Sequence, residues 1–308
     1  MKLKFYLLLL ALNLFNCKAQ NIPLYVGTYT SGDSEGIYQL QFNTETGELS
    51  NRHLAIATEN PSFITYSKNK KYLYAVGEGE VSAVTAFKII KNGKLEFINV
   101  ENSQGKGPCH ISINSTGNKA VVSNYGGGTV SLFNINADGS LNKASQVFNH
   151  NSENQKSHAH SAQFYNEDLF VADLGRNALY QYKLHENNFK LQSSSIIEMK
   201  GNPGPRHFVL TNSGEFIYII NEYGCSITSV RKINEGFKQI DIDSTLDKNY
   251  KGKNSCADIH LSKDERFLYG SNRGENSIAV FKRDVNTGTI NKIQNISVHG
   301  NWPRNFTI

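Results

Sequence analysis

The sequence predicts an all-β fold in which similar small sheets form a ring, a β-propeller. A hairpin pattern, two runs of β-branched and aromatic residues joined by a turn, recurs along the chain. Its copies cover residues 61–80, 107–128, 158–177, 204–224 and 256–276, and a third alternating run follows each copy. The equivalent positions Tyr25, Tyr74, Val121, Phe170, Tyr218 and Tyr269 are separated by steps of 49, 47, 49, 48 and 51 residues. A constant step of about fifty residues with about four strands is typical of a propeller blade.

The end of the chain resembles the start of a further repeat. Residues 302–306, WPRNF, parallel residues 205–208, PRHF, but the sequence stops before a turn and a second strand. Six repeats and this start predict a seven-bladed propeller whose last blade is incomplete in the given chain. The sequence leaves two explanations open, a chain truncated at its C-terminus or a last blade assembled in another way.

Residues 1–20 have the pattern of a secretory signal. Lys2 and Lys4 precede an apolar run at 5–12, which is too short for a stable membrane span. Cleavage after Ala19 would release a soluble protein, and cleavage before Cys17 would give a lipid-anchored one. We therefore expect residues 21–308 to form a single exported domain, either periplasmic or lipid-anchored to the bacterial envelope.

The charge distribution and the cysteine spacing limit the kinds of partner and ligand that we expect. The formal net charge is +5, part of which comes from lysines of the predicted signal, and no basic stripe is present. This argues against a nucleic acid partner. Cys109, Cys225 and Cys256 lie in different repeats without zinc-type spacing. A disulfide between two of them is open to an exported protein but needs α-carbons within about 7 Å of each other, and we expect free thiols instead. We predict no metal and no cofactor.

The hairpins bring polar residues to one edge of each sheet. Residues before the first strand and after the second are equidistant from the turn, so they should lie opposite each other. These pairs are His110 with Asn124, His158 with Asp173, Arg206 with Glu222, and Asp258 with Arg273. Because the first strand of every blade lines the central channel, the pairs should converge on one mouth. Arginine forks beside histidines and carboxylates suit a small anionic ligand.

Several of these residues also have purely structural interpretations. His160, His207 and His260 can bond to neighbouring backbone, and Asp258 can simply pair with Arg273. The side chains of Asn124 and Asp173 are more typical of turn caps. Tyr125 and Trp302 can either line the pocket or close a blade junction. His158 and His160 share one face of a strand, but no third metal ligand is evident.

Eight motifs, in their order along the chain, resemble the seven-bladed propeller lactonases. They are YVGTYT (25–30), SNYGGGTVSLF (123–133), HAHS (158–161), DLGRN (173–177), GPRH (204–207), NEYG (221–224), ADIHLSKDERFLYGSNRGENSIAVF (257–281) and WPRNF (302–306). This family includes bacterial propeller-type 6-phosphogluconolactonases and fungal carboxymuconate cycloisomerases. The sequence departs from the pattern in lacking the rest of the seventh blade, and also at Cys109 and Glu78.

The resemblance implies a carboxylic ester hydrolase that opens a sugar lactone. It places the catalytic residues at His158, Arg206, Glu222 and Arg273, with either Glu222 or His158 as general base. The predicted substrate-binding residues are His110, His160, His207, Asp258, His260 and Arg304. Two alternatives stay open, a muconate cycloisomerase and a non-catalytic propeller that binds a sugar acid or a protein partner. Export favours a non-phosphorylated aldonolactone as substrate, because sugar-phosphate lactones are not expected outside the cytoplasm.

Overall fold

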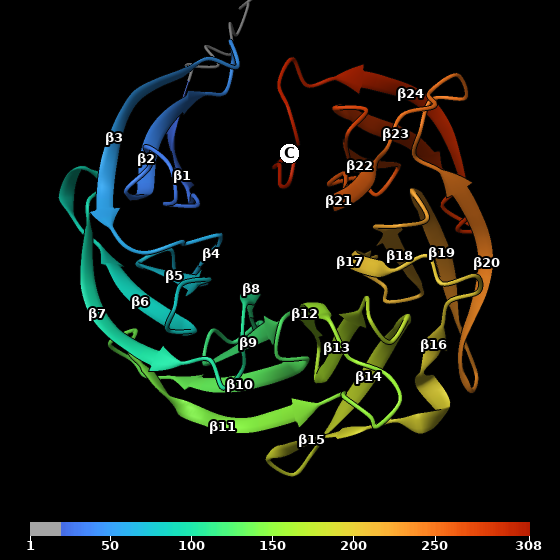
Figure 1. The fold of residues 1–308 in the computed structure, drawn as a ribbon, viewed down its shortest axis with the longest axis horizontal. Coiled ribbons are helices and arrows are strands. Elements are labelled where there is room, and N and C mark those ends of the chain that lie inside the picture. Colours follow the sequence, from blue (N-terminus) through green and yellow to red (C-terminus); the bar gives the residue numbers. More distant parts are fainter. Residues whose placement is uncertain (1–19) are drawn as a thin grey trace, which may run out of the picture.

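The computed structural model describes residues 20–308, which form six antiparallel sheets arranged around a common centre (Figure 1). The all-β propeller prediction is confirmed. The predicted signal at residues 1–20 and its Cys17 lie, apart from residue 20, outside the described residues. No helix in residues 20–308 has the length and apolar character needed to cross a lipid bilayer.

Each sheet follows the chain order of its strands. The first contains β1 (Asn21–Val26), β2 (Gly36–Asn43) and β3 (Leu49–Ala57). The second contains β4 (Phe63–Tyr66), β5 (Tyr72–Gly77), β6 (Ala83–Ile89) and β7 (Leu95–Asn102), and the third β8 (Pro108–Ile113), β9 (Lys119–Asn124), β10 (Thr129–Ile135) and β11 (Leu141–Asn149). The fourth contains β12 (Ala159–Tyr165), β13 (Asp168–Asp173), β14 (Ala178–His185), β15 (Asn188–Leu191) and the short β16 (Ile197–Glu198). The fifth contains β17 (Pro205–Leu210), β18 (Phe216–Asn221), β19 (Ser226–Ile233) and β20 (Gly236–Ser244), and the sixth β21 (Ser255–Leu261), β22 (Phe267–Arg273), β23 (Ser277–Arg283) and β24 (Ile290–Ser297). Single turns of 3-10 helix occur at Lys91–Gly93 and Ser193–Ser195.

The predicted hairpins correspond to the first two strands of the second to sixth sheets. Their first strands, β4, β8, β12, β17 and β21, lie nearest the centre of the ring (Figure 1). The first sheet differs, because Tyr25 lies in β1 whereas Tyr74, its equivalent, lies in the second strand of its sheet. β1, β2 and β3 therefore correspond to the second, third and fourth strands of the other sheets.

The prediction of a seventh blade is not met by the described residues, which contain six sheets. Residues 298–308 form no strand and lie between β1 and β21 (Figure 1). Side chains rather than a backbone ladder hold this segment, with Asn305 Nδ2 donating to Asp258 Oδ2 at 2.6 Å. A strand needs a hydrogen-bonded neighbour in register, and residues 302–306 pair with neither sheet beside them.

Apolar clusters join neighbouring sheets along the ring. Five of them link the first sheet to the second, the second to the third, and so on to the sixth. The cluster between the fourth and fifth sheets, for example, packs Phe170 of β13 against Ile219 of β18. The faces of these sheets are thus buried against each other. The polar residues of the site lie at the strand ends instead.

A buried asparagine or aspartate lies at or next to the end of the second strand in four of the hairpins. The amide nitrogen of Asn124 donates to Thr129 Oγ1 at 3.0 Å and to the carbonyl of Ser103 at 2.9 Å. Asn221 in β18 and Asn272 in β22 make equivalent bonds to serine or threonine in the following strand. Asp173 Oδ1 accepts backbone hydrogen bonds from residues 158 and 176, as a turn cap does. These Asx residues pin the turns that carry the site.

We expect Asn124→Ala to lower the free energy of unfolding by about 1–3 kcal/mol, because it leaves buried polar partners without a donor. Urea denaturation at neutral pH measures this change. Asn188→Ala, at an exposed position, is the control and should stay within about 0.5 kcal/mol of wild type. Equal stabilities for the two variants would contradict a structural role for the buried amide.

Candidate functional site

The site is built from β-bulges that recur at the start of the inner strands. The register shifts between residues 108 and 110 in β8, 159 and 161 in β12, 205 and 207 in β17, and 256 and 259 in β21. A bulge adds a residue to one strand and re-aims its side chain. The bulges place Cys109, His160, Arg206 and Asp258, all buried, around the centre of the ring.

One carboxylate oxygen of Glu222 lies between two arginines. Arg206 Nε is 2.8 Å and Arg273 Nη2 is 3.0 Å from Glu222 Oε2. The arginine side chains are 1% and 6% exposed, and that of Glu222 is 17% exposed. The pairing of Arg206 with Glu222 follows the hairpin geometry expected from the sequence. Arg273 arrives from the neighbouring sheet, at the end of β22.

Three consecutive carbonyl oxygens of β21 hold both arginines from behind. Arg273 donates from Nε to Ser255 at 3.2 Å and from Nη2 to Cys256 at 2.8 Å. Arg206 Nη1 donates to the carbonyl of Ala257 at 2.6 Å. Burial lowers the pKa of Arg206 to about 10, with Arg304 and Arg273 adding to the effect, so the guanidinium stays charged at neutral pH. A fixed anion-binding pair of guanidinium groups results.

Asp258 does not pair with Arg273, one of the interpretations left open by the sequence. Its Oδ1 is 2.8 Å from His207 Nδ1, and its Oδ2 is 2.9 Å from His260 Nε2. Burial raises the pKa of Asp258, but hydrogen bonds from the two histidines outweigh it and hold the pKa well below the usual range. With Asn305 also bound to it, Asp258 joins the inner strands of two sheets to the C-terminal segment.

Three buried histidines form a neutral floor below the charged pair. The ring centroids of His110 and His207 are 5.4 Å apart, and those of His160 and His207 are 5.2 Å apart. Burial lowers the pKa of His207 to about 4, and it also lowers the pKa values of His110 and His160 well below the usual value. Burial likewise raises the pKa of the Cys109 thiol to about 12. The floor is therefore uncharged at neutral pH.

His158 lies on another side of the mouth, stacked on Tyr125 with ring centroids 4.5 Å apart. Its Nδ1 is 3.0 Å from the carbonyl oxygen of Tyr125, so Nδ1 carries a hydrogen and the tautomer with a free lone pair has it on Nε2. Burial, followed by nearby Tyr223 and then Glu222, raises the pKa of Tyr125 to about 12. Within residues 20–308, no direct ion pair or hydrogen bond joins His158 to Arg206, Glu222 or Arg273.

A second arginine–glutamate pair, which the sequence analysis did not identify, lies across the C-terminal segment. Arg304 Nη2 is 3.8 Å from Glu78 Oε1, and its guanidinium lies 5.6 Å from the ring centroid of Tyr29. Glu78 also accepts hydrogen bonds from Ser62 at 2.6 Å and Tyr29 at 3.0 Å. The repeat contained the signal, because Glu78 follows β5 as Glu222 follows β18, and Arg304 occupies the WPRNF position that matches Arg206.

Trp302 takes part in the mouth as well. Its ring centroid is 5.6 Å from the guanidinium carbon of Arg273, and the residue is 57% exposed. Residues 20–308 contain no cluster of three or more histidine, cysteine, aspartate or glutamate side chains with the geometry of a metal site.

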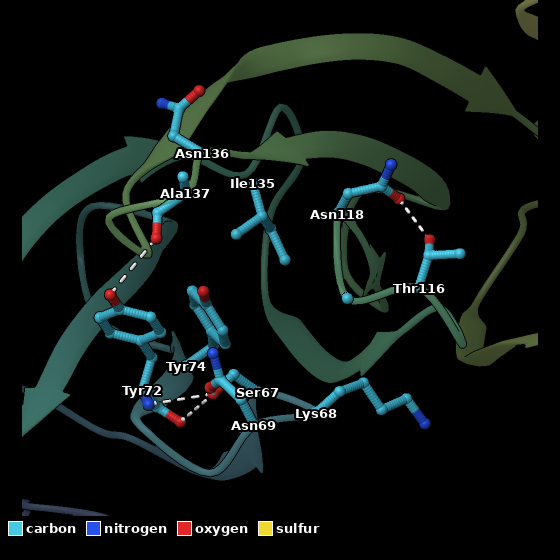
Figure 2. Close-up of a pocket in the computed structure, with 11 residues that line it drawn as sticks. Ser67, Lys68, Asn69, Tyr72, Tyr74, Thr116, Asn118, Ile135, Asn136 and Ala137 are labelled. Atoms are coloured by element: carbon cyan, nitrogen blue, oxygen red, sulfur yellow. Dashed lines mark hydrogen bonds between the residues drawn. The ribbon is translucent and has the colours of Figure 1, made fainter.

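A separate pocket lies between the second and third sheets, at the hairpin-turn ends of their strands (Figure 2). Its lining includes Lys68 beside uncharged groups, with the Tyr72 hydroxyl donating to the carbonyl of Ala137 at 3.4 Å. The turn ends form the edge of the sheets opposite to Glu222. A single lysine with no acid–base partner does not favour this pocket as the reaction site.

Comparison with known proteins shows similarity to lactonases in sequence and in structure. Residues 23–308 match a family model described as lactonase, seven-bladed β-propeller. A Bacillus subtilis protein named 6-phosphogluconolactonase is 33% identical over 92% of this chain and 83% of its own length. A Formosa agariphila protein of the same name is 34% identical over 92% and 86%. The structure of the Pseudomonas aeruginosa periplasmic gluconolactonase is 28% identical, with a TM-score of 0.85 over 92% of this chain and 85% of that one.

The neutral floor predicts a loss of stability in mild acid. The unfolded chain protonates its histidines below about pH 6.5, whereas folding keeps His207 neutral down to about pH 4. Unfolding therefore takes up protons in this range. As the pH is lowered through this range, the free energy of unfolding should fall by up to about 1.4 kcal/mol per pH unit for each of His110, His160 and His207.

Urea denaturation of wild type, His160→Gln and His185→Gln at pH 7.5 and 5.0 measures this effect. The His160 variant should lose less stability between the two pH values than wild type. His185 is exposed, and its variant should behave as wild type does. A His160 variant with the full pH dependence of wild type would contradict a neutral buried imidazole.

Proposed function

The chain belongs to the seven-bladed β-propeller lactonase family, and on that basis we propose that it hydrolyses a sugar lactone at the mouth around Glu222. The observation that carries the proposal is the Glu222 carboxylate oxygen shared by Arg206 and Arg273. Lactone opening develops negative charge on the carbonyl oxygen, and a preorganised pair of guanidinium groups offsets such charge. The relatives and the structural neighbour reported above carry lactonase names, which favours hydrolysis over muconate cycloisomerisation.

In the proposed mechanism, His158 is the general base. Its Nε2 holds the ring lone pair, because Nδ1 is committed to the carbonyl of Tyr125. A water gives its proton to Nε2 while its oxygen adds to the lactone carbonyl carbon. Collapse of the tetrahedral oxyanion breaks the bond to the ring oxygen, and the imidazolium returns the proton to that oxygen. The product is an open-chain sugar acid.

Glu222 has a different task in this mechanism. Its Oε2 already lies within 3.0 Å of both guanidinium groups, so we assign Glu222 to holding Arg206 and Arg273 in place beside the lactone by charge. The arginines then bind the carbonyl oxygen as charge develops. His110, His160, His207, Asp258, His260 and Arg304 are proposed to shape and line the mouth rather than to exchange protons.

We further propose that the protein is exported and acts on a non-phosphorylated aldonolactone. The signal-like pattern of residues 1–20 supports export, with either a soluble periplasmic protein or a lipid anchor at Cys17. The periplasmic gluconolactonase among its structural neighbours fits this location. The family description supports a ring of seven blades, and we propose that residues 302–306 occupy an inner-strand position in it.

The test is acid release at constant pH with glucono-δ-lactone, its 6-phosphate and a muconolactone, each corrected for spontaneous hydrolysis. We expect the unphosphorylated glucono-lactone to be turned over fastest. In His158→Gln, kcat should fall by about 100-fold or more, since general base catalysis typically contributes about 100- to 10,000-fold. His185→Gln is the control and should keep wild-type kcat.

Two results would overturn parts of this proposal. Folded wild-type protein that opens none of the lactones would leave a binding platform for a sugar acid or a protein partner. A His158 variant with wild-type kcat would remove His158 as the base.

A further inference from the structure

Two cysteines lie on neighbouring segments behind the charged pair, and one asparagine side chain contacts both sulfur atoms. Cys225 lies three residues after Glu222, in the turn between β18 and β19, and Cys256 lies in β21. The backbone N–H of Cys256 donates to the carbonyl of Glu222 at 3.1 Å, which brings the turn and the strand together. Asn254 Nδ2 is 3.3 Å from Cys225 Sγ and 3.8 Å from Cys256 Sγ. Both thiols are free in this structure.

The backbone at Cys225 is unusual for a cysteine. Its φ is 45°, in the left-handed region that favours glycine or asparagine. The equivalent turn positions in the third, fourth and sixth sheets hold Gly128, Asn177 and Asn276, with φ values of 65°, 54° and 57°. The fifth sheet alone among these four places a cysteine there. Local backbone preference does not explain the residue, whereas a role for its sulfur does.

The two thiols have complementary chemistry. Cys225 is partly exposed, and a hydrogen bond from Cys256 lowers the pKa of Cys225 to about 6. Burial raises the pKa of Cys256 well above its usual value. A partly exposed thiolate beside a buried thiol is the arrangement of an attacking and a resolving cysteine.

We propose that Cys225 and Cys256 are a redox-active pair that forms a disulfide by exchange with a small-molecule disulfide such as oxidised glutathione. The Cys225 thiolate attacks one sulfur of glutathione disulfide, giving a mixed disulfide and one glutathione thiolate. The Cys256 thiol then loses its proton and attacks the Cys225 sulfur, releasing the second glutathione. The two cysteines lose two electrons and the glutathione disulfide gains them; the proton of Cys256 passes to one glutathione thiolate, and the other takes up from solvent the proton that Cys225 had released on ionising.

The bond would join the turn that carries Glu222 to the strand that holds both arginines. The carbonyls of residues 255–257 in β21 accept from Arg273 and Arg206, so a link at Cys256 fixes their support relative to Glu222. Any effect of this link on catalysis rests on the proposed lactonase function, whereas formation of the bond does not. Cross-linking two segments restricts the unfolded chain and stabilises the fold.

Cys109 provides an internal control. It is buried in another sheet, and its sulfur lies 3.3 Å from the carbonyl oxygen of His160. Burial raises the pKa of its thiol to about 12, so we expect it to stay reduced under the same conditions.

The experiment treats the reduced full chain with oxidised glutathione, alkylates it under denaturing conditions, and reads its intact mass and peptide map. Wild type and Cys109→Ser should both yield a linked peptide containing Cys225 and Cys256. Cys256→Ser should stop at the glutathione adduct on Cys225. Cys225→Ser should form neither the linked peptide nor a glutathione adduct at Cys256. A wild-type protein in which both thiols remain open to alkylation would overturn the proposal, as would a Cys256→Ser protein without the adduct.

Thermal unfolding and lactone hydrolysis separate the two proposals. Oxidation should raise the Tm of wild type by about 5 °C and leave that of Cys225→Ser unchanged. A linked protein without this rise in Tm would contradict the inference that the bond stabilises the fold by joining the turn of Glu222 to β21. A protein that forms the link but opens no lactone in either the reduced or the linked state would contradict the proposed function and leave the proposal of a thiol pair standing.

Discussion

Burial of Arg206 is the constraint on which the centre of this propeller depends. A guanidinium at 1% exposure is stable only with a carboxylate and further acceptors around it, because an unpaired buried charge is costly. Glu222 of the same hairpin supplies the carboxylate, and Ala257 of the next sheet supplies a carbonyl. The fifth and sixth sheets must therefore meet in one arrangement, and this arrangement also brings Arg273 to Glu222.

The site consists of two layers with different electrostatics. The upper layer is charged, with Glu222 between its arginines, and the lower layer contains histidines that burial keeps neutral. A neutral floor adds no competing positive charge below the guanidinium groups. Asp258 supports both layers, since His207, which it orients, lies with its Nε2 3.4 Å from Arg206 Nη1. The position of the arginine thus depends on a carboxylate that it does not touch.

Periodicity made most of the fold predictable. A constant step between Tyr25 and its equivalents predicted the hairpins, and equidistance from a turn placed Arg206 opposite Glu222. The bulges at the inner strands were not predictable, because strand pattern does not reveal an extra residue. Asp258 therefore faces His207 and His260 rather than Arg273, although distance from the turn suggested the arginine. The seventh blade was inferred from the five residues 302–306, which on their own form no sheet.

In the proposed mechanism, the carboxylate charge of Glu222 holds Arg206 and Arg273 in their working positions. Glu222→Gln keeps the shape of the side chain and removes that charge. The decisive measurement is its kcat for glucono-δ-lactone hydrolysis, compared with wild type, after circular dichroism has shown that the variant is folded. We predict a loss of about 100-fold or more, the usual effect of disturbing a group that stabilises an oxyanion. A folded variant with wild-type kcat would contradict the claim.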